Sequence, residues 1–249
     1  MTPAPGQLPK TLICLPTYNE RENLPLMVEA IHQEVPEIHI LIIDDNSPDG
    51  TGALADGLAQ AHDFVHVLHR EKKQGLGRAY VAGFHWALAR DYELIFEMDC
   101  DFSHPVRFLP EFLRQAQNFD VVLGSRYIPG GATEDWDWKR RLISRGGNTY
   151  AQAILGLPYK DLTGGFKCFR RKVLETLPLD EIVSNGYVFQ IEMTWRAVLL
   201  GFTFGEVPIH FPDRTRGQSK MSGSIVREAV VNVWKLRLAK ASLSAGRSK

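Results

Sequence analysis

The sequence predicts an α/β fold in which helices cover both faces of a mostly parallel sheet. Short apolar runs alternate with stretches of helical spacing through the first half of the 249-residue chain. Runs of this kind are typical of parallel strands that are buried on both faces. Because the strands are parallel, their carboxyl ends meet at one edge, where open α/β sheets bind ligands.

Each apolar run of the first half ends in a turn and is followed by helical spacing, as in Leu76, Tyr80, Phe84 and Leu88. The expected strands are Thr11–Leu15, Ile38–Ile43, Phe64–Leu68, Leu94–Met98 and Asp120–Leu123. The expected helices are Glu20–Glu34 with Asn19 as its cap, a helix ending near Ala61, Gly75–Arg90 and Phe108–Gln117.

Beyond Leu123 the regular alternation ends, and no linker is long or polar enough to divide the chain. We expect helices at Lys139–Leu155, Tyr187–Leu200 and Ile225–Lys240, strand-like segments at Asp161–Arg170 and Phe204–Phe211, and a basic loop at Asp213–Ser224. The predicted organisation is a disordered tail (1–9), a single domain (10–222), and an amphipathic interface helix with its tail (223–249).

Composition excludes several classes of protein. Lys+Arg and Asp+Glu are both 29, so the net charge of +0 gives no global attraction for nucleic acid. The three cysteines, Cys14, Cys100 and Cys168, have no metal-site or disulfide spacing and indicate reduced core residues. No secretion signal is visible, and no apolar run approaches the roughly 18–20 residues that cross a bilayer.

Two acids, Asp99 and Asp101, follow the apolar run that ends at Met98. Their position predicts that both lie at the carboxyl edge of the sheet, with His104-Pro105 behind them. Carboxylate oxygens there suit a divalent cation that is shared with a diphosphate. The alternative is a polar turn that opens the next helix.

Polar residues also follow the first two predicted strands. Asp44 and Asp45 begin the segment Asp44–Gly50, and a carboxylate there could accept hydrogen bonds from a nucleotide base or ribose. Tyr18 could stack on a base, and Glu20 could bind base or ribose. The alternative is that these residues only form turns, which Asp, Asn, Ser, Pro and Gly favour.

A diphosphate at this edge needs cations, because the spacing of a phosphate-binding loop is absent. Gly75-Leu76-Gly77 is better interpreted as a helix start than as a dinucleotide fingerprint. The candidate cations are Arg126, Arg214, Arg216 and Lys220. Exposed basic loops are also common as solvated surface, so that alternative stays open for the last three.

Several motifs occur together in one order, from about Thr11 to about Ser222. They are Pro-Thr-Tyr-Asn-Glu, Asp-Asp-Asn-Ser-Pro-Asp-Gly-Thr, Gly-Leu-Gly, Met-Asp-Cys-Asp, Gly-Ser-Arg-Tyr, Thr-Gly-Gly-Phe-Lys and Gly-Gln-Ser-Lys. This set resembles the family 2 glycosyltransferases, and among them the dolichyl (polyprenyl) phosphate mannose synthases. The resemblance implies a GT-A-type, Rossmann-like fold. Cys100 stands where the family usually has alanine, at a position used through its backbone.

The resemblance also implies roles for individual residues. It assigns catalytic roles to Asp99, Asp101 and Arg126, and metal binding to Asp99 and Asp101. The implied donor-nucleotide contacts are Pro16, Tyr18, Glu20, Ile43, Asp45, Asp99, Cys100, Asp101 and Arg126. The implied acceptor-phosphate contacts are Ser103, Arg140, Arg214, Arg216 and Lys220.

The implied reaction is inverting transfer of mannose from GDP-mannose to a dolichyl or polyprenyl phosphate, with Mg²⁺ or Mn²⁺ as cofactor. A phosphate monoester has a second pKa of about 6, so the acceptor needs no strong base. Thr163-Gly164-Gly165 indeed has glycine where many family 2 enzymes have a carboxylate, and Asp161 is better interpreted as a turn residue. The alternatives are transfer from UDP-glucose, a soluble acceptor, or a silent nucleotide-binding protein.

The lipid acceptor predicts peripheral attachment to the cytoplasmic face of a membrane, directly or through a small anchor subunit. Ile225–Lys240 has apolar residues opposite cations, and Trp136–Arg141 places aromatic residues beside cations. Both patterns suit a membrane interface. The alternatives are a helix packed on the domain and a solvated loop.

Overall fold

A seven-stranded sheet with strand order β3-β2-β1-β4-β7-β5-β8 forms the centre of the molecule. The computed structural model describes residues 8–182, 184–212 and 230–238, and all structural statements concern these residues. The strands are β1 (Thr11–Thr17), β2 (His39–Asp44), β3 (Val65–His69), β4 (Leu94–Glu97), β5 (Val121–Ser125), β7 (Lys167–Arg170) and β8 (Phe204–Pro208). Only β7 runs antiparallel to its neighbours in this sheet. The predicted α/β class and mostly parallel sheet are confirmed.

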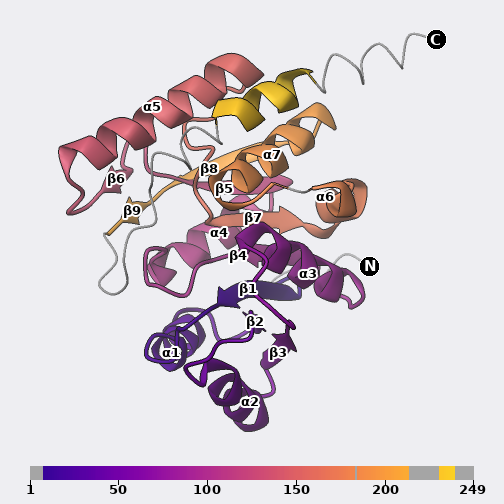
Figure 1. Ribbon diagram of the computed structural model, residues 1–249. Coiled ribbons are helices and arrows are strands. Elements are labelled where there is room, and N and C mark those ends of the chain that lie inside the picture. Colours follow the sequence, from indigo (N-terminus) through magenta and orange to yellow (C-terminus); the bar gives the residue numbers. More distant parts are fainter. Residues whose placement is uncertain (1–7, 183, 213–229, 239–249) are drawn as a thin grey trace.

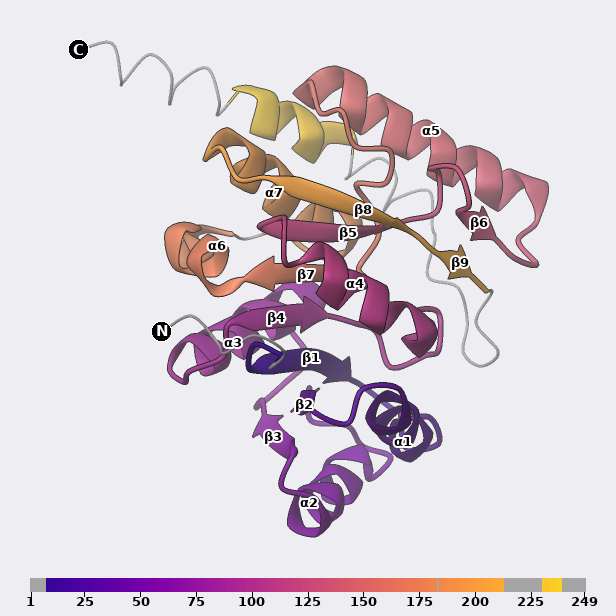
Figure 2. The ribbon, with the colours of Figure 1, turned by 180° about the vertical axis from the view of Figure 1, so that it is seen from behind.

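Helices lie on both faces of this sheet (Figures 1 and 2). They are α1 (Leu24–Glu34), α2 (Thr51–Ala61), α3 (Leu76–Leu88), α4 (Leu109–Gln115), α5 (Trp138–Leu155), α6 (Arg171–Thr176) and α7 (Gly186–Leu199). Short 3-10 turns lie at Val106–Phe108 and Leu179–Glu181, and a small parallel pair joins β6 (Ala132–Thr133) to β9 (His210–Phe211).

The core divides into two layers because alternate strand residues point to opposite faces of the sheet. Ile13 and Phe96 pack with α1, α2 and α4 on one face. Cys14 and Ile95 pack with α3, α6 and α7 on the other face. The helical spacing of the sequence therefore matches the side that each helix buries.

A third layer lies outside α7. In both views α5 runs beside the helical residues 230–238, which are drawn in yellow (Figures 1 and 2). Val233 and Leu236 pack there with Leu155 of α5 and Trp195 of α7, and the Tyr150 hydroxyl donates to the Val230 carbonyl at 3.1 Å. Among the described helices, none combines the length and apolar character that crossing a membrane requires.

The first helix begins later than its sequence pattern predicts. Helix α1 starts at Leu24, and Asn19 is not its cap but has a left-handed backbone with φ 61°. The backbone N–H of Glu20 donates to Thr51 Oγ1 at 3.0 Å, so the turn before α1 is held by the start of α2. That contact joins residues far apart in sequence, which helical periodicity cannot reveal.

The topology brings five segments to one edge. The parallel strands β1, β2, β4 and β5 end there, and antiparallel β7 begins there. The segments beyond these strand ends contain Tyr18, Asp45, Asp99, Arg126 and Gly165. The candidate site lies at this edge.

Candidate functional site

Asp99 is held from two sides after β4. Its Oδ1 accepts a hydrogen bond from the Tyr80 hydroxyl of α3 at 3.1 Å. Its backbone N–H donates to His104 Nδ1 at 3.0 Å. The His104 ring is buried and stacks on Phe166, with 5.1 Å between ring centroids. The direction of Asp99 is therefore set by groups on α3 and on the following loop.

Asp101 is held by its own loop, since its Oδ1 accepts a hydrogen bond from the backbone N–H of Ser103 at 3.0 Å. Between the two acids, Cys100 is buried, and its burial raises the pKa of the thiol well above its ordinary value. Cys100 therefore stays a neutral core residue, whose backbone alone can face a ligand.

The two acids fit a hard divalent cation as a partial ligand set. Carboxylate oxygens suit Mg²⁺ and Mn²⁺. Across the described residues, no group of three or more His, Cys, Asp or Glu side chains is arranged as a complete metal site. A cation at Asp99 and Asp101 would thus take its other ligands from a bound molecule or water, as expected for an ion shared with a diphosphate.

A buried charged pair lies beneath the acids. Glu97 of β4 is opposite Lys167 of β7 in the strand register, and both side chains are buried. Burial raises the pKa of Glu97 to about 7 and lowers the pKa of Lys167 to about 8, while each charge opposes the shift of the other. Lys167 Nζ also donates to the Gln190 carbonyl at 2.7 Å and to Thr194 Oγ1 at 3.0 Å, which ties α7 to the sheet.

Most acids of the Asp44–Gly50 segment have structural partners. Asp44 accepts hydrogen bonds from the Ser47 hydroxyl at 2.6 Å and from the Thr17 hydroxyl at 3.1 Å. Asp49 accepts from the backbone N–H of Thr51 at 3.0 Å, at the start of α2. These two acids fix the loop, as the turn interpretation predicts, and Asp45 is the acid of the segment that the resemblance assigns to the nucleotide.

The nucleotide candidates of β1 and β2 differ in exposure. Tyr18 is 36% exposed and carries Lys73 Nζ over its ring at 3.6 Å, whereas Pro16 and Glu20 are partly buried. Asp45 is buried and pairs with Arg70, and burial raises its pKa despite that charge. The Ile43 side chain points into the core, so only its backbone can meet a ligand.

Arg126 has an internal partner, which changes how its predicted role is understood. Its Nε donates to Asp161 Oδ2 at 2.6 Å and its Nη2 donates to Asp161 Oδ1 at 2.6 Å. Both side chains are almost fully buried, and Nη2 also donates to Thr163 Oγ1 at 2.9 Å. Burial alone would lower the pKa of Arg126, but the Asp161 carboxylate outweighs burial and raises it. The charge that we expected to face a diphosphate is balanced inside the protein.

The acceptor candidates are only partly described. Arg140 lies over the buried Trp136 ring, 3.9 Å from its centroid, at the start of α5. Ser103 is buried behind Asp101, and its role in acceptor binding stays a prediction. The other three, Arg214, Arg216 and Lys220, lie outside the described residues.

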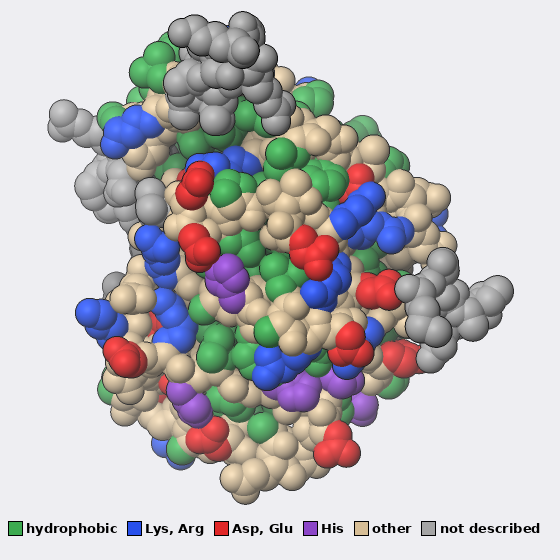
Figure 3. All heavy atoms as spheres, turned by 90° about the vertical axis from the view of Figure 1, so that its right-hand side faces the viewer, with side chains coloured by type: hydrophobic (Ala, Val, Ile, Leu, Met, Phe, Trp, Pro, Cys, Tyr) green, Lys and Arg blue, Asp and Glu red, His purple; other side chains and the backbone are tan. Residues whose placement is uncertain are grey.

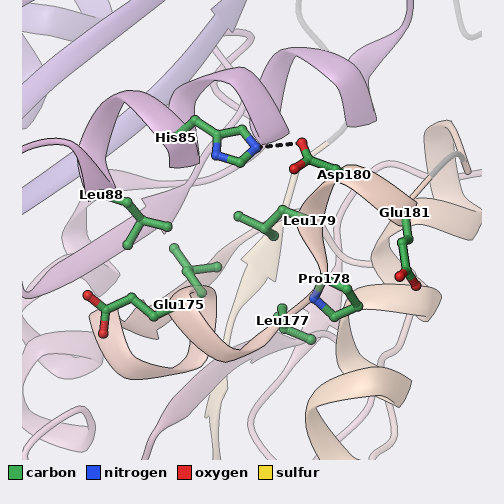
Figure 4. Close-up of a pocket in the computed structure, with 9 residues that line it drawn as sticks. His85, Leu88, Glu175, Leu177, Pro178, Leu179, Asp180 and Glu181 are labelled. Carbon is green, nitrogen blue, oxygen red and sulfur yellow. Dashed lines mark hydrogen bonds and ion pairs between the residues drawn. The ribbon is translucent and has the colours of Figure 1, made fainter.

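A different face of the molecule carries charges of both signs. Figure 3 shows a face on which Lys, Arg, Asp, Glu and His side chains are interspersed without a patch of one sign. A pocket of about 290 Å³ lies between α3 and α6, where leucines and Pro178 line it together with His85 and acidic residues (Figure 4). Two of its polar residues, His85 and Asp180, contact each other at 3.0 Å and are exposed to solvent.

The sequence motifs do not include two residues that contact the candidate acids: Tyr80 contacts Asp99, and Arg70 contacts Asp45. In the sequence Tyr80 fits an apolar helix face, and Arg70 belongs to none of the motifs. The pattern that could have indicated Tyr80 is Gly77-x-x-Tyr80-x-x-Gly83, with small residues one helical turn on either side of a polar aromatic residue.

Comparison with known proteins adds independent information. The sequence profile described as Glycosyl transferase family 2 matches residues 12–177. The chain is 51% identical over 232 residues to polyprenol monophosphomannose synthase of Mycolicibacterium smegmatis, covering 92% of this chain and 88% of that protein. It is 48% identical over 230 residues to undecaprenyl-phosphate mannosyltransferase of Micrococcus luteus, covering 92% of this chain and 95% of that protein.

Solved structures share the fold at low sequence identity. Glucosyl-3-phosphoglycerate synthase of Mycobacterium tuberculosis, in complex with Mn²⁺, UDP and phosphoglyceric acid, gives a TM-score of 0.68 at 15% identity, covering 92% of this chain and 78% of that one. Mannosyltransferase PcManGT of Pyrobaculum calidifontis, in complex with GDP-Man and Mn²⁺, gives a TM-score of 0.62 at 15% identity. This match covers 96% of this chain and 66% of that one. These likenesses support the GT-A fold.

Proposed function

The chain belongs to glycosyl transferase family 2, and from that premise we propose that it transfers mannose from GDP-mannose to a polyprenyl phosphate. The products are polyprenyl phosphate β-D-mannose and GDP. Two relatives at about half identity over nearly the whole chain carry names of this activity, which supports the proposal. Their coverage also supports a single catalytic domain over residues 10–222.

The donor nucleotide lies along the ends of β1, β2 and β4 in this proposal. Tyr18 offers an exposed ring for stacking on the base, and Glu20 and Asp45 offer carboxylates to base and ribose. Pro16, Ile43 and Cys100 lie at the same edge, where their backbone atoms would contact the donor. Arg126 acts by holding Asp161 and Thr163 beside the donor, and not as an unpaired cation.

Asp99 and Asp101 would hold Mg²⁺ or Mn²⁺ together with the donor diphosphate. When bound, the ion stabilises the negative charge that develops on departing GDP. The protein side of this arrangement is the orientation of the carboxylates, which Tyr80 and the Ser103 backbone provide.

The observation that best supports a phosphate acceptor is the pairing of Asp161. This acid lies beside the Thr163–Gly165 turn, and its carboxylate is committed to Arg126 at two 2.6 Å contacts. A sugar hydroxyl would need a base to remove its proton. A phosphate monoester is already largely ionised at neutral pH, so its oxygen attacks the anomeric carbon directly and the bond to the diphosphate breaks.

We assign the acceptor phosphate to the basic residues on the α5 side of this edge. Arg140 stacks on Trp136 there, and Arg214, Arg216 and Lys220 follow β9 in the sequence. Ser103 would complete the set from the loop after Asp101. Clustered cations also offset the repulsion between two phosphates that must come close.

A surface of α5 and residues 230–238 suits contact with a membrane. We call it the interface platform, and its exposed apolar residues are Trp138, Leu142, Ile143, Val230, Val231, Trp234 and Leu238. Exposed cations, Lys139, Arg141, Lys235 and Arg237, lie on the same two segments. Trp136, which the sequence suggested for this contact, is buried and stacks on Arg140.

The platform predicts peripheral binding at the cytoplasmic face of a membrane, and it is also where a small anchor subunit would dock. The exposed apolar side chains enter the headgroup region while the cations meet anionic lipid. Residues 230–238 pack on the domain through Val233 and Leu236, which agrees in part with the alternative that this helix packs on the domain. Its remaining face is available to lipid.

Removing two tryptophans from the platform is expected to weaken lipid binding. In Trp138→Ala/Trp234→Ala, cosedimentation with vesicles containing anionic lipid should fall about tenfold or more, since 1.4 kcal/mol of lost apolar contact is a factor of ten. The matched control is Leu26→Ala, which removes an exposed apolar side chain from α1 at the other end of the molecule. Equal vesicle binding by all three proteins would contradict the platform.

The alternative donor is UDP-glucose, and a soluble acceptor is the alternative to lipid. We expect radiolabel from GDP-mannose, and not from UDP-glucose, to enter a chloroform-soluble product with undecaprenyl phosphate. GDP should also raise the melting temperature in the presence of Mn²⁺ more than UDP does. Greater transfer from UDP-glucose, or label in a water-soluble product only, would contradict the proposed function.

A further inference from the structure

Tyr80 is a fully buried side chain whose polar atom points at the candidate metal ligand. Its hydroxyl donates to Asp99 Oδ1 at 3.1 Å, from the middle of α3. No comparison or sequence motif gives this residue a role. We infer that Tyr80 is a positioning residue, which orients the Asp99 carboxylate for the cation and the donor diphosphate.

The tyrosine ring is fixed by its neighbours. It stacks on Phe189 of α7 with centroids 6.0 Å apart and an angle of 7°, and on Phe84 with centroids 6.2 Å apart. A phenol held in this way is a donor of fixed direction.

Two glycines allow α3 to approach closely enough for this contact. A Cβ on Gly77 would lie 2.6 Å from the Ser184 carbonyl and 2.8 Å from the Phe189 ring. A Cβ on Gly83 would lie 2.6 Å from Ile43 Cδ1 and 2.9 Å from Cys14 Sγ. Because both glycines lie one helical turn from Tyr80, they set its depth against the sheet and α7. The Gly75-Leu76-Gly77 motif thus gains a packing role.

The other side of Asp99 is also restrained, which makes the tyrosine contact effective. His104 accepts the Asp99 backbone N–H, and an added Cβ on Gly165 would lie 3.5 Å from His104 and 3.9 Å from Asp99 Oδ1. The carboxylate therefore has fixed groups on the α3 side and on the β7 side. Partners that orient a metal ligand in this way typically change metal affinity 10- to 100-fold.

This inference rests on the proposed metal site, so the experiment separates the two. The probe is Mn²⁺ with GDP, and free Mn²⁺ is measured by electron paramagnetic resonance with wild type and Tyr80→Phe. The phenylalanine ring retains the two stacking contacts, so we expect the melting temperature without ligand to change little. The affinity for Mn²⁺ should fall about tenfold or more, and raising the Mn²⁺ concentration should restore most of the turnover.

The matched control is Tyr92→Phe. Tyr92 is also a buried side chain, but it precedes β4, at the opposite edge, where its hydroxyl contacts His39 at 2.9 Å and His66 at 3.1 Å. This variant should bind Mn²⁺ within about twofold of wild type. Unchanged affinity in Tyr80→Phe, or an equal loss in Tyr92→Phe, overturns the positioning role alone. Absence of Mn²⁺ binding by wild type with GDP overturns the metal site and the inference together.

Discussion

Asp101→Ala is expected to reduce mannose transfer below detection, a loss of at least about 10³-fold in kcat/KM. The acid lies beyond β4, where its carboxylate is oriented by the backbone N–H of Ser103 at 3.0 Å. Removing it removes a cation ligand, so charge on the departing diphosphate is no longer stabilised. The measurement is steady-state transfer from radiolabelled GDP-mannose to undecaprenyl phosphate at saturating Mn²⁺.

Two further variants make that result interpretable. Asp101→Asn can still accept the Ser103 hydrogen bond but lacks the charge, and it should be nearly as inactive as the alanine variant. Asp91→Ala removes an exposed acid from the opposite end of β4, where it pairs with Lys10, and should retain normal turnover. Near-normal transfer by Asp101→Ala would show that this acid does not bind the cation.

Asp161→Asn is expected to destabilise the protein by about 3–5 kcal/mol, because it leaves the Arg126 guanidinium buried without a counter-charge. In a chain of this size that corresponds to a fall of roughly 10 °C in melting temperature. The two charges now meet through a pair of 2.6 Å hydrogen bonds with almost no exposure to solvent. Chemical denaturation monitored by circular dichroism measures the difference.

The control for this pair is Glu111→Gln, which breaks an exposed Arg114–Glu111 pair on α4 and should cost less than about 1 kcal/mol. The double variant Arg126→Met/Asp161→Leu replaces both charges by apolar groups and should recover much of the lost stability. If Asp161→Asn is no less stable than Glu111→Gln, the pair does not hold this edge together.

The same pair predicts a dependence of stability on pH. Burial alone would raise the pKa of Asp161, but Arg126 outweighs burial and lowers it below the ordinary value. A carboxyl with a lowered pKa stabilises the fold above its unfolded pKa of about 3.9. That contribution is lost as pH falls through the lower folded value, so the difference between wild type and Asp161→Asn should shrink in strong acid.

The sequence predicted the sheet well because its strands are continuous apolar runs buried on both faces. The five predicted strands of the first half all occur, and helices α2, α3 and α4 follow the expected order. The predicted start of α1 at Glu20 was wrong, because a contact between Glu20 and Thr51 shapes the turn before the helix. The antiparallel direction of β7 also could not be predicted, since a four-residue strand carries no signal of its direction.

The candidate site likewise has residues that the sequence could predict and contacts that it could not. Residues that follow strand ends, such as Asp99 and Asp45, were predictable because parallel topology sends all those ends to one edge. The contacts of Arg126 with Asp161 and of Tyr80 with Asp99 were not, because each joins residues that pair only after the chain has folded. The sequence thus gives the position of an acid or a cation, and the fold decides which neighbour takes its charge.

The proposed function depends most on a cation at the carboxyl edge of the sheet that protein acids share with the donor diphosphate. A crystal structure with GDP-mannose and Mn²⁺, with data collected at the manganese absorption edge, tests it directly. We expect an anomalous peak in contact with carboxylate oxygens of Asp99 or Asp101 and with the donor diphosphate. A fully occupied nucleotide bound elsewhere, or bound at this edge with no manganese beside either acid, would contradict it.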